Sequence, residues 1–228
     1  TVQARQTLAE FSQGRFILGL GVSNIGVQTV RGHEWKAPVD KFNEYLDAMS
    51  SVQTEMAKYE QYNAAVESEL SNYNNLGPLL IAAHGPALQK IAKNRTDGVM
   101  TYLMSPEHTK VSRGRLGQNS DLTVVVPVLA ESNKAEARKV SRKSLAYYTE
   151  LDYYQREWKK VGFEEKDFAN KGSDRLVDHI VAWGNKESIK SRINEHFMAG
   201  ASRIVLFPLD TGFGNATDSP TLKMLAPV

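Results

Sequence analysis

Cysteine is absent from all 228 residues. This absence excludes disulfides, thiolate metal ligands and cysteine nucleophiles, and it fits the reducing cytoplasm in which we expect the protein to work. No apolar run approaches the roughly 20 residues that span a bilayer, and the first residues, Thr1–Arg5, lack the apolar core of a signal peptide. The formal net charge of +2 is too small to attract nucleic acid or an anionic membrane. We therefore expect neither of these partners.

The composition is otherwise that of an ordinary globular protein, with 41% hydrophobic and 24% charged residues. Short runs that are apolar almost throughout alternate with helical patterns, as in a parallel sheet covered on both faces. Pro127 lies inside one run and cannot donate to a ladder, so we expect that strand to end or bulge there. Five runs are predicted to be strands: Arg15–Leu20, Pro78–Ala83, Gly98–Leu103, Leu122–Leu129 and Ser202–Phe207.

The segments between these runs have helical signals. Ile189, Ile193 and Phe197 recur every four residues and predict one apolar stripe, with Gly200 as the stop. The polar stretch 38–72 contains no strong breaker and predicts one long helix or two shorter ones. Two further helices are expected to begin at N-cap residues, Asn133 and Ser173. No repeat or linker divides the chain, so residues 1–228 are predicted to form a single α/β domain.

Strand–helix alternation does not by itself separate an open doubly wound sheet from a barrel. A dinucleotide-binding turn requires Gly-x-Gly-x-x-Gly directly between a strand and a helix. Gly19 and Gly21 begin such a pattern, but Gly26 comes two positions late and the next helix is not expected before about Pro38. A Gly-Lys-Ser/Thr phosphate loop is also absent from the sequence. Neither nucleotide-binding motif is therefore present.

Short blocks follow one another in a fixed order along the chain: Gly14–Ser23, Arg31–His33, Tyr45–Met49, Ala82–Pro86, Ser105–Thr109, Gly172–Asp178 and Ala182–Gly184. In this order they resemble the luciferase-like monooxygenase superfamily, and in particular its deazaflavin (F420)-dependent oxidoreductases. The similarity extends from about Gln3 to Asp210. It implies a TIM (β/α)8 barrel of the bacterial-luciferase type. Because family barrels have three strand–helix units before the first block, the chain is expected to hold only the last five strands.

The resemblance implies a cofactor site at the carboxyl ends of two strands. Glycines there let a backbone approach a flat ring closely, although a tight turn is an alternative reason for them. The turn that opens the next helix suits a phosphate through its exposed amides, although it is otherwise an ordinary helix start. His84 is expected to be a loop residue that faces solvent or substrate, rather than an acid-base group. The expected cofactor-binding positions are Gly19, Gly21, Val22, Ser23, Ala83, His84, Gly85, Pro86, Ala87 and Leu88.

The function implied is hydride transfer between F420 and an unidentified organic substrate. The alternatives are a monooxygenase that uses reduced FMN and oxygen, and a truncated non-catalytic flavin-binding relative. F420-dependent sugar-phosphate dehydrogenases of this fold carry a glutamate where Val22 stands, so sugar-phosphate oxidation is disfavoured. No catalytic acid or base is assigned, because those positions are expected in the missing N-terminal part. Homodimerisation stays open.

Other chemistry-bearing residues are given structural roles. The histidines lack metal-ligand spacing with carboxylates, so no metal site is predicted and solvated or capping roles are favoured for His33, His108, His179 and His196. The Arg113–Arg115 segment is expected in a solvated loop. An aromatic group at helical spacing is expected to pack, with the wall of an apolar substrate pocket as the alternative. Its members are Tyr147, Tyr148, Tyr153, Tyr154 and Trp158.

Overall fold

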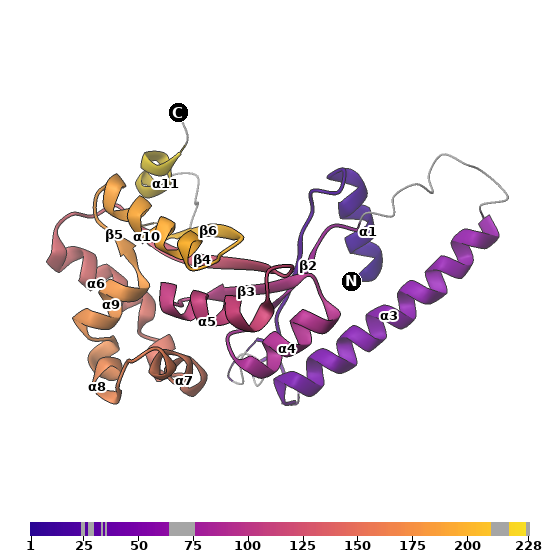
Figure 1. Cartoon of the computed structure of the whole chain (residues 1–228), viewed down its shortest axis with the longest axis horizontal. Helices are drawn as coiled ribbons and strands as arrows, with labels where there is room; N and C mark the ends of the chain where they lie inside the picture. Colours follow the sequence, from indigo (N-terminus) through magenta and orange to yellow (C-terminus); the bar gives the residue numbers. More distant parts are fainter. Residues whose placement is uncertain are drawn as a thin grey trace. The chain divides into compact units, whose positions relative to one another are not determined.

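The computed structural model describes residues 1–23, 26, 30–32, 34, 36–63, 76–210 and 219–226. The chain divides into two compact units, Thr1–Val99 and Met100–Val228, and the boundary falls inside strand β3 (Gly98–Tyr102). The strand order is β1-β2-β3-β4-β5, and β6 pairs with β4. Figure 1 follows these elements along the chain.

Unit 1 alternates helices with two parallel strands. Strand β1 pairs with β2 in parallel, with Leu18 opposite Leu79 and Leu20 opposite Ile81. The stretch predicted as one or two helices contains the single helix α3 as far as Asn63, and residues 64–72 lie outside the described part. The elements are α1 (Val2–Phe11), β1 (Leu18–Leu20), α3 (Pro38–Asn63), β2 (Leu79–Ala82) and α4 (Pro86–Arg95).

The approach to β2 is fixed by a glycine and an arginine. Gly77 has a φ of +66°, and a Cβ placed on it would lie 1.9 Å from the carbonyl oxygen of Phe16. A side chain is therefore excluded both by the left-handed backbone and by the neighbouring chain. The carbonyl of Gly77 accepts a hydrogen bond from Nη2 of Arg5 in α1. This turn aligns the amino ends of β1 and β2.

Unit 2 is built around β4. Thr123–Val128 of β4 pair in parallel with Arg203–Pro208 of β6, and Val128–Leu129 pair in parallel with β5. The strands are β4 (Asp121–Leu129), β5 (Ala182–Trp183) and β6 (Arg203–Pro208). The helices are α5 (Pro106–Leu116), α6 (Lys134–Leu145), α7 (Asp152–Lys160), α8 (Glu165–Phe168), α9 (Asp174–Ile180), α10 (Lys186–Met198) and α11 (Pro220–Leu225), with 3-10 turns η1 (Tyr148–Glu150) and η2 (Ala169–Lys171).

The α/β architecture with parallel strands, predicted from the sequence, is confirmed. All five predicted strands form, with ends that differ by up to three residues, and the two-residue strand β5 was missed. The expectation that β4 ends or bulges at Pro127 is wrong. Pro127 pairs in register with Phe207, and the strand continues to Leu129. A proline removes one donor, and the flanking pairs of Val126 and Val128 hold the strand in place.

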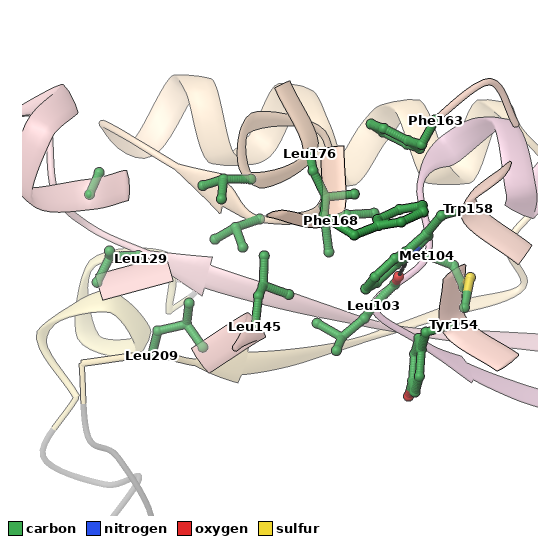
Figure 2. Close-up of a cluster of buried hydrophobic side chains, with 14 residues drawn as sticks. Leu103, Met104, Leu129, Leu145, Tyr154, Trp158, Phe163, Phe168, Leu176 and Leu209 are labelled. Carbon is green, nitrogen blue, oxygen red and sulfur yellow. Dashed lines mark hydrogen bonds between the residues drawn. The ribbon is translucent and has the colours of Figure 1, made fainter. Parts of the chain in front are cut away.

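The core of unit 2 is aromatic and aliphatic. Figure 2 shows Trp158 beside Leu103 and Phe168, and Trp158 is fully buried. Its ring lies 5.9 Å from that of Phe168 and 5.4 Å from that of Tyr154. Packing is thus the role of Trp158 and Tyr154. Burial raises the pKa of Tyr154 and of Tyr102, and raises that of Tyr153 to about 12, so these phenols stay neutral at ordinary pH.

Two of the histidines expected at the surface are buried instead. His108 and His196 are each 1% exposed. His196 Nδ1 lies 2.9 Å from Thr109 Oγ1, and His108 Nδ1 lies 3.3 Å from Ser112 Oγ. The first bond joins α10 to α5 and the second lies within α5, and a hydrogen-bond partner for each imidazole permits its burial. Burial of His196 also corrects the predicted apolar stripe of α10, because Ile189 and His196 are buried whereas Phe197 is 46% exposed.

Arg113 is not in a solvated loop but in the last turn of α5. Its Nε donates to the carbonyl of Gly200 at 2.7 Å, and its Nη1 donates to those of Gly117 and Ser120 at 2.6 and 2.8 Å. Its Nη2 donates to Ser202 Oγ at 2.8 Å. The planar fork thereby joins the end of α5 to the turn before β6. Gly200, the predicted stop, has a φ of +104° after α10.

Candidate functional site

The first predicted segment lies at the carboxyl end of β1. Neither Gly19 nor Gly21 has a positive φ, so a tight turn does not account for these glycines. A Cβ on Gly19 would have no atom of the described residues within 4 Å, and one on Gly21 would lie 3.7 Å from the Cβ of Ala82. Gly19 therefore borders open space, while Gly21 rests against the end of β2. Ser23 has a φ of +63°, a strained conformation for a residue with a side chain.

The second segment lies at the carboxyl end of β2. Ala83 is 1% exposed and His84 is half-buried. Gln89 in α4 is buried and donates through Nε2 to the carbonyls of Ala83 at 3.3 Å and His84 at 3.1 Å. This amide fixes the turn between strand and helix. Sequence reasoning missed it, although an uncharged polar residue between Leu88 and Ile91 was a signal of a buried polar contact.

The helix that follows this turn has an open amino end. Gly85 is the N-cap of α4, with φ −90° and ψ 163°, and Pro86 occupies the first turn. Any residue adopts that extended conformation, so backbone strain does not require a glycine here. Among the described residues no side chain caps α4. Unit 2 differs, because several of its helices are capped by side chains, those of Ser105, Asn133, Ser173, Asn185 and Ser219.

The β1–β2 pairing brings the two segments together. Leu20 of β1 lies opposite Ile81 of β2, so both strands deliver their carboxyl ends to the same edge. All ten predicted positions lie in unit 1. Among these positions His84 alone carries an ionisable side chain. The arrangement can hold a flat ring beside Gly19 and an anionic group at the amino end of α4, where amides and the helix dipole are exposed.

Unit 2 has its own conspicuous strand end. Leu103 follows β3, has a φ of +58° and is 1% exposed. A buried leucine in the left-handed region is strained and needs compensation from its surroundings. Trp158 Nε1 donates to the Leu103 carbonyl at 2.8 Å, which supplies such compensation. The sequence carried no signal of this conformation, because leucine is not a residue expected there.

Comparisons with known proteins agree with this architecture. The model of the luciferase-like monooxygenase family matches residues 1–203. The chain is 22% identical over 242 residues to 5,10-methylenetetrahydromethanopterin reductase of Archaeoglobus fulgidus, an alignment that covers 90% of this chain and 71% of that protein. No helix in the described part of the chain is long and apolar enough to cross a membrane.

Two solved structures share the fold. An F420-dependent secondary alcohol dehydrogenase, in complex with an F420-acetone adduct, superposes with a TM-score of 0.56 at 14% identity, covering 91% of this chain and 69% of that one. The FMN complex of a Baeyer-Villiger monooxygenase from Pseudomonas putida superposes with a TM-score of 0.50 at 14% identity, covering 90% and 68%. The family match spans most of the sequence and agrees with the parallel α/β fold. The chain belongs to the luciferase-like monooxygenase family.

Proposed function

We propose that the chain is an oxidoreductase that binds F420 at the carboxyl ends of β1 and β2 and serves hydride transfer to or from an organic substrate. The observation that carries the proposal is the pairing of open space at Gly19 with an uncapped helix end at Gly85. The similar proteins support an oxidoreductase function, since two of them are a methylenetetrahydromethanopterin reductase and an F420-dependent dehydrogenase.

The residues of β1 fit the ring of such a cofactor. Gly19 is exposed and a Cβ there would project into open space, so the backbone is accessible to a flat group. A Cβ on Gly21 would make only an ordinary contact with Ala82, at 3.7 Å. When bound, F420 supplies the carbon that accepts or gives the hydride, and the protein supplies position and a dry surface.

The turn between β2 and α4 fits the phosphate-bearing tail. Pro86 lacks an N–H, and Ala87 and Leu88 follow it in the first helical turn, where backbone donors point away from the helix. Gln89 holds the carbonyls of Ala83 and His84, so these acceptors are turned into the protein. The open amino end of α4 is thus left to an anion.

Flavin chemistry is the second candidate. The Pseudomonas putida monooxygenase of the same fold is in complex with FMN, and FMN also combines a flat ring with a phosphate. Reduced FMN and oxygen would then serve a monooxygenase reaction. Under F420 chemistry, Val22 follows Gly21 directly and brings no carboxylate to the end of β1, which speaks against sugar-phosphate oxidation.

The test of the ring site is a fluorescence titration of the 228-residue chain with F420 and, separately, with FMN. Saturable binding of F420, at least tenfold tighter than FMN, is expected. Gly19→Ala should weaken it, whereas Gly114→Ala in α5 adds the same methyl group to open space in unit 2 and should leave it unchanged. Tighter binding of FMN would favour the monooxygenase, and binding of neither cofactor would contradict both.

The tail site is tested by placing a charge at the helix end. The extended backbone of Gly85 suits an aspartate N-cap, so Gly85→Asp should stabilise α4 by roughly a few tenths of a kcal/mol. The same carboxylate would occupy the amides and repel a phosphate, so cofactor affinity should fall at least tenfold. Gly85→Ser caps without charge and should weaken binding less. Because Gly85→Asp should not destabilise the helix, unfolding would not explain a loss of affinity. An unchanged cofactor affinity in Gly85→Asp would refute the tail site.

A further inference from the structure

A second polar cavity lies in unit 1, away from the proposed cofactor site. Its volume is about 340 Å³, within the range of small-ligand clefts. Its walls come from α1, α3, the start of β2 and the carboxyl end of α4. Because α4 has ten residues at 1.5 Å each, the cavity lies about 15 Å from the helix end at Gly85.

Arg5 is the buried charge of this cavity. The residue is 8% exposed, and its Nε has no hydrogen-bond partner among the described residues. Its Nη2 donates to Gly77. Burial lowers the pKa of Arg5, and the negative charge of Asp97 acts against that shift. Asp97 already accepts the Leu79 N–H through Oδ2 at 2.7 Å.

Two further cations border the same space. Lys93 and Arg95 lie in the last turn of α4, whereas Asp97 is the one carboxylate among the lining residues. The lining side chains thus carry a formal charge of +2. The dipole of α4 accounts for cations at its carboxyl end, and Arg95 is held by Asn43 and Asp47. The dipole argument fails for Arg5, which lies near the amino end of α1, where no acidic residue occupies the first turn.

We infer that this cavity is a binding site for a small phosphorylated molecule, with Arg5 as its buried anchor and Lys93 at its mouth. The chemistry matches a dianion. An arginine fork binds two phosphate oxygens at once, and a lysine supplies a mobile point charge. Asn94 and Thr96 add polar groups beside them, and Met49 and Leu46 give an apolar wall for the rest of the molecule. The site is separate from the proposed redox site and does not depend on it.

The test is a calorimetric titration of the chain with inorganic phosphate at constant ionic strength, with chloride as the matched salt. Saturable binding at the cavity is expected. Arg5→Gln and Lys93→Gln should each weaken it at least tenfold, as loss of a charged contact implies. Lys139→Gln is the control, since Lys139 is an exposed cation of α6 in unit 2.

The two substitutions differ in whether they also remove a contact that stabilises the fold. Arg5→Gln also removes the bond to Gly77, so its circular dichroism must be compared with that of the parent chain. Lys93 is exposed, so Lys93→Gln tests the site with the fold intact. Absence of saturable phosphate binding would overturn the inference, and so would equal affinity in Lys93→Gln, Lys139→Gln and the parent chain.

Discussion

Gly77→Ala should damage unit 1 more than any other single methyl group. The alanine would have to adopt a φ of +66°, which costs about 1–2 kcal/mol. Its Cβ would also lie 1.9 Å from the Phe16 carbonyl oxygen, where real Cβ atoms stay beyond 3.0 Å. The backbone must therefore move by roughly 1 Å against the pairing of Leu18 with Leu79. We expect a total loss of at least about 3 kcal/mol.

A matched variant separates the two contributions. Gly32 has a φ of +70° and a Cβ there would meet no atom of the described residues within 4 Å. Gly32→Ala should therefore cost about 1 kcal/mol from the backbone conformation alone. Urea unfolding followed by circular dichroism gives both losses, and amide hydrogen exchange at Leu18 assigns the Gly77→Ala loss to unit 1. Equal unfolding midpoints for the two variants would refute the clash argument.

Three further expectations concern unit 2. Burial lowers the pKa of His196 to about 4, so the folded chain holds this imidazole neutral. As pH falls from 6.5 to 4 the unfolded chain takes up a proton that the folded chain does not, and the free energy of unfolding should fall by roughly 3 kcal/mol. His196→Gln should flatten this pH dependence in urea titrations, and an unchanged pH dependence would contradict the assignment. Trp158→Phe should lower the free energy of unfolding by about 1–3 kcal/mol, because it leaves the buried Leu103 carbonyl without its donor. An unfolding midpoint equal to that of the parent chain would show that this hydrogen bond contributes nothing to stability. Arg113→Lys should cost about 2 kcal/mol in the same assay, because a lysine does not reproduce the fork that reaches Gly200; parental stability would refute the joining role of the arginine.

The strands were predictable because their signal is local. Runs of apolar residues such as those of β4 and β6 are long enough to recognise, and parallel pairing followed from their lack of alternation. Strand β5 has two residues, which is too short for any pattern. The error at Pro127 has the opposite cause. A local rule forbade the ladder, but pairing with Phe207 from a distant segment kept the strand in place.

The buried polar contacts were beyond local reasoning. Thr109 and His196 are 87 positions apart in sequence, as are Arg113 and Gly200. No periodicity reports a partner at that separation, so the Arg113–Arg115 segment was expected in a solvated loop and His196 in a solvated or capping role. The ten candidate positions of the cofactor site came instead from ordered family blocks, and their binding role stays a prediction. The structure adds Gln89, whose contacts fix the turn they share.

The glycines of unit 1 separate into two kinds once their geometry is known. Gly77, at the amino end of β2, is explained by its own backbone, since its φ is positive and a Cβ would strike Phe16. Gly19, near the carboxyl end of β1, has no positive φ, and a Cβ there would strike no atom of the described residues. The effect of its missing side chain is therefore to leave space open. In parallel α/β barrels the amino ends of strands serve stability and the carboxyl ends bind ligands. The strained, non-glycine conformations of Ser23 and Leu103 also follow strands at their carboxyl ends, where strain is maintained when a shaped surface needs it. Among the described residues, the open space at Gly19 is therefore the feature that most directly supports the proposed ligand site.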